Sequence, residues 1–196
     1  MSENTATDWA VLTTAHDALR TVVRGLAADD LAKPTPCAEW TVAQVIQHAA
    51  GDQIGYAAFI TGGPGPEENP FAPSGILGAP ADVLVDRAMS AAAAAFATVP
   101  ADAAEVAVPI PPNKLTAELA AGACALDAAV HAWDLAVASG QPSPLTSELA
   151  RQLLPVAQAL VEPLRGFAFA DALAGNDSEA VGVLLRYLGR NPQWQA

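Results

Sequence analysis

The chain has 196 residues, of which 52% are hydrophobic and 15% charged, so we expect one folded domain with a sizeable core and not a disordered chain. Its formal net charge of −12 repels phosphate backbones and anionic lipid surfaces, which argues against nucleic-acid and membrane binding. Cys37 and Cys124 form no CxxC motif, so a disulfide framework is not expected. The first residues lack a basic segment followed by an apolar core, and we expect a cytoplasmic protein.

Periodic apolar positions and a high alanine content predict an all-α protein, because alanine is the strongest helix former. The first helix is expected over residues 7–24. The second has the clearest start in the chain. Thr41 and Gln44 match a capping box, and Trp40 before the cap is placed to pack on Val45 as a hydrophobic staple.

Residues 62–80 are rich in glycine and proline and are expected to form a long loop, of the kind that acts as a lid or as a mobile excursion. The third helix is predicted over residues 81–98. The fourth is predicted over 116–139, with Gly140 as a left-handed cap.

Further helices follow the fourth. One is predicted over residues 146–164, bent or interrupted at Pro155. A short last helix is expected to be capped by Asn176 or Asp177 and to end at Gly189.

This pattern predicts a single helical-bundle domain over residues 1–196, with the core bundle at about 7–140 and a C-terminal helical extension at about 141–196. Cofactor and metal sites in bundles are built from side chains that point inward from facing helices. Polar side chains on apolar helix faces are therefore the candidates for a site.

The fourth helix carries such a set. At 100° per residue, Cys124, Asp127, His131 and Asp134 fall within one arc of about 80°. A carboxylate and an imidazole one turn apart, joined by a histidine from another helix, would supply three ligands and leave a position open, as in catalytic zinc sites. The spacing alone leaves another reading for His131, because a lone histidine on an apolar face is more often a core residue.

On the second helix, His48 and Asp52 are four residues apart and share a face. His16 in the first helix has no evident partner and is read as a surface or packing residue. Asp134 opposes the helix dipole late in the fourth helix, so we expect it to have a specific partner, which the sequence does not name.

The remaining chemistry-bearing residue types are read as packing residues. Cys37 and Cys124 are expected to be small packed side chains, with a position in the site as the alternative for Cys124. Trp40 and Trp133 are expected to fill the core, with a ligand platform as the alternative. No phosphate-binding loop, GxSxG elbow or HExxH motif is present.

Three stretches carry a resemblance to a known family. TPCAEWTVAQVIQHAAGD at 35–52, ALDAAVHAWDLAVASGQ at 125–141 and LLRYLGRNPQW at 184–194 resemble the DinB-like superfamily. More narrowly, they are similar to the branch that contains the N-terminal, metal-binding domain of mycothiol-dependent maleylpyruvate isomerase. The resemblance implies a four-helix bundle that binds one divalent metal, usually zinc, although nickel or another transition metal would also fit.

The resemblance places the metal ligands at His48, Asp127 and His131. The acidic ligand of that branch is typically Glu, so Asp127 is one methylene shorter. The implied chemistry is a metal-activated thiolate, from mycothiol or a similar small thiol, that attacks an electrophilic substrate in a transferase or isomerase reaction. Asp52 and Asp134 are general-base candidates. The isomerase has a separate C-terminal catalytic domain, so maleylpyruvate isomerisation itself is not expected of this chain.

Two other classes of function compete with the enzyme. The same bundle could hold a metal or small ligand without catalysis, as a sensor or scaffold, or its site could have decayed into an interaction surface. Retention of both histidines and the carboxylate argues against decay. An exposed apolar helix face would support a homodimer, and the 62–80 loop could close over a substrate.

Overall fold

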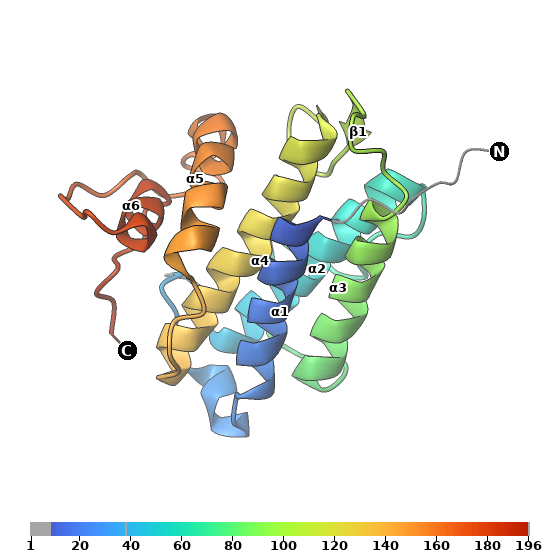
Figure 1. Ribbon diagram of the computed structural model, residues 1–196. Helices are drawn as coiled ribbons and strands as arrows, with labels where there is room; N and C mark the ends of the chain where they lie inside the picture. Colours follow the sequence, from blue (N-terminus) through green and yellow to red (C-terminus); the bar gives the residue numbers. More distant parts are fainter. Residues whose placement is uncertain (1–8, 38, 196) are drawn as a thin grey trace.

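The computed structural model describes residues 9–37 and 39–195, and its fold over these residues is all-α and DinB-like. One two-stranded antiparallel ribbon and two short 3-10 turns accompany the helices (Figure 1). The elements are α1 (Ala10–Arg24), η1 (Ala28–Ala32), α2 (Val42–Thr61), α3 (Ala81–Phe96), β1 (Val106–Ala107), β2 (Lys114–Leu115), α4 (Ala117–Ser139), α5 (Ser147–Leu160), η2 (Glu162–Leu164) and α6 (Ala180–Tyr187).

Helix α4 is the centre of the fold. It packs against α1, α2 and α5, and 18 of its 23 residues are buried. Its alanines allow this, because small side chains let neighbouring helices approach closely from several sides. Figure 1 shows α1, α2 and α3 on one side of α4, with α5 and then α6 on the other. The two C-terminal helices therefore extend the four-helix bundle along α4.

The predicted helix ends around the site are confirmed. The Thr41 hydroxyl accepts from the Gln44 amide, and the Gln44 side chain accepts from the Thr41 amide at 2.9 Å, which completes the capping box. Thr116 caps α4, and Gly140 ends it with φ of 75°. Helix α2 and helix α4 thus begin and end where local signals place them.

Other boundaries differ from the prediction. Helix α6 begins at Ala180, because Asp177 forms an ion pair with Arg186 instead of capping the helix. Helix α5 continues through Pro155 to Leu160 without interruption. Helix α3 ends two residues earlier than expected. The expected start of the first helix, at residue 7, lies outside the described residues.

The 62–80 segment contains neither helix nor strand, and it is attached to α2. The side-chain amide of Gln44 donates to the carbonyl of Pro73 at 3.1 Å, and the backbone amide of Gly75 donates to the Gln47 side chain at 2.8 Å. These bonds fix the loop over the N-terminal half of α2. Within the described ranges, no helix combines the length and hydrophobicity that a bilayer crossing requires.

Candidate metal centre

His48 of α2 meets Asp127 and His131 of α4 where the two helices face each other. The Nε2 atoms of His48 and His131 lie 3.5 and 3.4 Å from Oδ1 of Asp127. The imidazole rings stand edge to face, with centroids 4.7 Å apart. Potential ligand atoms of all three residues lie within 4.8 Å of one another. Two imidazole nitrogens and a carboxylate oxygen are a donor set that suits Zn²⁺.

The far nitrogen of each imidazole is already bonded. Nδ1 of His48 lies 2.8 Å from the carbonyl oxygen of Pro70, and Nδ1 of His131 lies 3.0 Å from the Asp134 carboxylate. A carbonyl oxygen only accepts, so Nδ1 of His48 carries a proton and donates to it. Both Nε2 atoms therefore face Asp127. Metal-binding histidines are commonly oriented by such bonds from the other ring nitrogen.

His48 and Asp127 stabilise each other's charged forms where they meet. Burial opposes the charged form of His48, but its contacts with Asp127 and Asp52 and the Pro70 carbonyl raise its pKa to about 9. Burial likewise opposes ionisation of Asp127, yet the two histidines keep its pKa below the usual value. A carboxylate that stays ionised in the interior favours a cation beside it.

A second set of hydrogen bonds holds the other carboxylate oxygen of Asp127. Its Oδ2 accepts from the Gln53 amide at 3.2 Å. The Gln53 carbonyl oxygen in turn lies 2.8 Å from Nε2 of His16 and accepts from the Cys124 thiol at 2.9 Å. His16 is buried, so the prediction that it is a packing residue is confirmed, and the alternative of a surface residue is wrong. Cys124 is a buried core residue, as expected.

Asp134 has a specific partner, as its unfavourable position near the end of the α4 dipole predicted. Arg190, which follows α6, donates from Nε and Nη2 to the two carboxylate oxygens at 2.9 and 2.8 Å. Burial opposes the charge of Asp134, but Arg190 and His131 lower its pKa to about 2. Asp134 is fully buried and is therefore a charged residue that orients His131.

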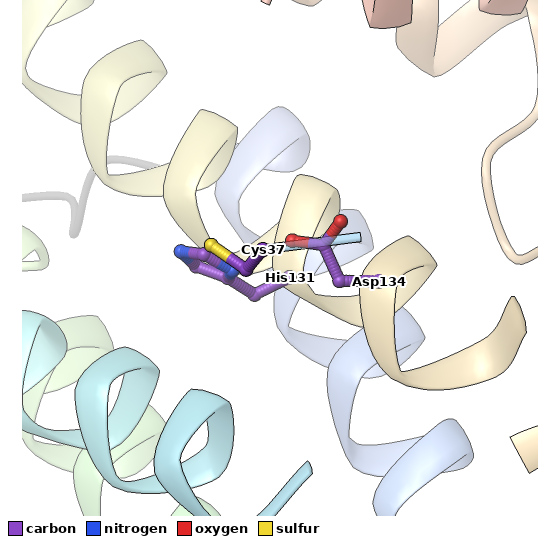
Figure 2. Close-up of side chains that lie close together, drawn as sticks. All are labelled: Cys37, His131 and Asp134. Atoms are coloured by element: carbon purple, nitrogen blue, oxygen red, sulfur yellow. Dashed lines mark hydrogen bonds and ion pairs between the residues drawn. The ribbon is translucent and has the colours of Figure 1, made fainter. Parts of the chain in front are cut away.

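Cys37 lies beside this pair, and Figure 2 shows its thiol close to His131 and Asp134. The three side chains form a second cluster with metal-ligand chemistry. Both Asp134 oxygens are already bonded to Arg190, and burial raises the pKa of Cys37 to about 11, which keeps the thiol neutral. The cluster of His48, Asp127 and His131 is therefore the better candidate for a metal.

The candidate ligands line a pocket of about 570 Å³. Asp52 also lines it, with a carboxylate oxygen 4.0 Å from Nε2 of His48. Burial and the neighbouring Asp127 raise the pKa of Asp52 to about 7. Trp40 was expected to fill the core, but its half-buried ring borders the pocket 4.6 Å from the His48 ring. Trp133 is buried, as expected.

The fold and this donor set define a DinB-like helical-bundle protein with a polar cluster that lines a pocket. The chain belongs to the mycothiol maleylpyruvate isomerase N-terminal domain family, whose sequence model matches residues 12–136. The match contains all three candidate ligands, whereas Arg190 and the α5–α6 side of the pocket lie beyond it.

Similar proteins occur in Mycobacterium tuberculosis. Uncharacterized proteins from strains CDC 1551 / Oshkosh and ATCC 25618 / H37Rv are each 34% identical to this chain over 151 residues, which is 76% of either length. No solved structure matches the chain significantly. Neither relative's description names a reaction.

Proposed function

We propose that this protein binds a divalent transition metal, zinc or alternatively nickel, through His48, Asp127 and His131. One observation carries the proposal: both imidazoles direct Nε2 at the same Asp127 oxygen while their Nδ1 atoms are bonded elsewhere. Imidazole and carboxylate ligands suit both metals. Three protein ligands leave a position free for a small molecule that enters the pocket.

We further propose that the bound metal serves a thiol-dependent transferase or isomerase reaction, with mycothiol or a similar small thiol as the cosubstrate. The family's description supports the choice of thiol. A divalent cation held by these residues would stabilise a thiolate over a thiol at neutral pH. Within the chain, Asp52 is the pocket carboxylate placed to accept the thiol proton, since it lies beside His48 and outside the three-ligand cluster. Asp134 does not line the pocket and only positions His131.

The metal site is tested by measuring metal content with mass spectrometry on the purified chain and three variants. We expect near-stoichiometric metal in the wild type and its loss in His48→Ala and His131→Ala, with helical content retained by circular dichroism. Asp86→Asn is the control, because it removes an exposed carboxylate that does not line the pocket. A wild type that takes up no zinc or nickel after reconstitution would overturn the proposal.

The thiol is tested separately on cobalt-substituted protein. Added thiol should produce a thiolate-to-cobalt absorption band in the wild type. Metal binding without such a band for any small thiol would contradict the transferase or isomerase proposal and favour a non-catalytic metal-binding module.

A further inference from the structure

The pocket has two chemically different walls. The polar wall comes from α2 and α4, inside the family match. The other wall comes from the end of α5, the segment that follows it and the residues just after α6, all beyond that match. Apart from Arg190, its large side chains are apolar: Leu160, Val161, Leu164, Phe167, Phe169 and Leu188.

This apolar wall is held in place by hydrogen bonds. Arg165 donates to the carbonyls of Ala170 and Tyr187 at 2.7 and 3.0 Å, and it pairs with Glu162 at 2.8 Å. The Tyr187 hydroxyl donates to the same Glu162 carboxylate at 2.8 Å. The segment that carries Phe167 is thereby tied to α6, so the wall is part of the fold.

Two aromatic rings lie at the exposed edge of the pocket. Phe71, from the 62–80 loop, and Phe167 have ring centroids 5.3 Å apart, and Phe71 also lies 5.6 Å from the His48 ring. Phe167 is 72% exposed and Phe71 is 42% exposed. Apolar surface left in water beside a cavity is typical of a ligand-binding site.

The charges around the pocket disfavour an anionic ligand. Among the lining residues that the structure describes, Arg190 is the one lysine or arginine, and its guanidinium is hydrogen-bonded to Asp134. The other lining residues with side-chain charge, apart from the two histidines, are the acids Glu39, Asp52 and Asp127. A carboxylate or phosphate on a ligand would find no unpaired side-chain cation on the apolar wall and would lose hydration there.

We propose that the pocket binds an uncharged aromatic or branched aliphatic small molecule, and that the residues 160–170 select it. In the context of the proposed function, which this inference deepens, that molecule is the electrophilic reactant. The volume of about 570 Å³ is within the ordinary range for small-molecule sites. Binding of such an apolar molecule requires only the apolar wall of the pocket and no metal, so it can be measured on the metal-free protein.

Two fluorescent dyes with a shared skeleton test the charge selection. N-phenyl-1-naphthylamine is neutral, and 8-anilino-1-naphthalenesulfonate adds one sulfonate to it. We expect the metal-free chain to bind the neutral dye at least about tenfold more tightly. Equal or tighter binding of the sulfonate would overturn the proposal.

Variants locate the dye in the pocket. Phe167→Ala should weaken binding of the neutral dye by about tenfold, the scale of losing one buried aromatic contact. Phe59→Ala is the matched control, because Phe59 is 47% exposed on α2 and does not line the pocket. Phe167→Arg should weaken the neutral dye and strengthen the sulfonate. Equal loss in Phe59→Ala and Phe167→Ala would place the dye on the general surface and contradict the proposal.

The metal assay separates this inference from the proposed function. Protein that retains metal but prefers the sulfonate, or binds neither dye, refutes the apolar selection and leaves the metal site standing. Protein that binds the neutral dye with the expected variant pattern but takes up no metal refutes the metal site and supports the apolar pocket.

Discussion

The guanidinium of Arg190 donates hydrogen bonds to both oxygens of the Asp134 carboxylate, at 2.9 and 2.8 Å, and both side chains are buried. The same carboxylate contacts Nδ1 of His131. Arg190 lies beyond the family-matched region, yet it binds the carboxylate that contacts the candidate metal ligand His131. The C-terminal extension supports the site through charge and hydrogen bonding, as well as covering it with apolar side chains.

Arg190→Ala should lower the free energy of unfolding by about 3–5 kcal/mol, because it leaves the buried Asp134 carboxylate without its partner. Urea denaturation followed by circular dichroism measures this. Arg24→Ala, which breaks an exposed ion pair with Asp86, is the control and should cost less than about 1 kcal/mol. Similar losses in both variants would contradict the assigned importance of the buried pair.

Asp134→Asn should weaken metal binding by about 10–100-fold, the usual effect of removing the partner that orients a ligating histidine. Competition with a chromophoric chelator measures the affinity. Asp86→Asn removes an exposed carboxylate that does not line the pocket and should leave affinity unchanged. Unchanged affinity in folded Asp134→Asn would show that Asp134 acts on stability alone.

His16 should make the metal-free fold less stable as pH falls from 6.5 to 4. Burial lowers its pKa from 6.5 to about 4. Arg20 acts in the same direction, whereas Gln53, Asp17 and Asp127 act against it. Between these values the unfolded chain binds a proton that the native chain does not, so acid favours unfolding by about 3 kcal/mol.

The measurement compares wild type with His16→Gln by urea denaturation at pH 7 and pH 4. The difference in unfolding free energy between the two proteins should shift against the wild type at pH 4. A pH-independent difference would mean that His16 titrates alike in both states.

Gly122→Ala should lower the melting temperature. A Cβ there would lie 2.7 Å from Cγ2 of Val156, so the overpacking cost of about 1–3 kcal/mol exceeds the gain in helix propensity of about 1 kcal/mol. Gly55→Ala on α2 is the matched control. Its Cβ would meet Pro109 at an ordinary 3.7 Å, so this change should raise the melting temperature.

Calorimetry of both variants, and of Gly122→Ala combined with Val156→Ala, distinguishes crowding from propensity. The double variant should recover part of the loss. A Gly122→Ala protein that melts above the wild type would show that α4 and α5 separate at little cost.

Local signals accounted for the parts of the fold that depend on neighbours in the chain. The capping box at Thr41 and Gln44 and the left-handed Gly140 depend on residues within one turn of a helix end, and both were predictable. Asn176 and Asp177 carry a capping signal too, yet the helix begins later. There the pairing of Asp177 with Arg186, nine residues further along, prevailed over the capping signal.

The candidate site divides in the same way. Helical periodicity placed Asp127 and His131 on one face, and family resemblance added His48. The supporting contacts had no such signal: Gln53 to Asp127, Arg190 to Asp134 and His48 to the Pro70 carbonyl join residues 74, 56 and 22 positions apart. No periodic pattern in the sequence connects them.

The sequence by itself determined an all-α chain, the ends of α2 and α4, and the shared face of Asp127 and His131, because helix geometry and capping are set within a few residues. Only the tertiary structure decided that His48 meets that face, that Arg190 neutralises Asp134, and that the C-terminal segment covers the pocket with apolar side chains. These depend on how helices pack across long chain separations, where burial and charge pairing over the whole domain select one arrangement.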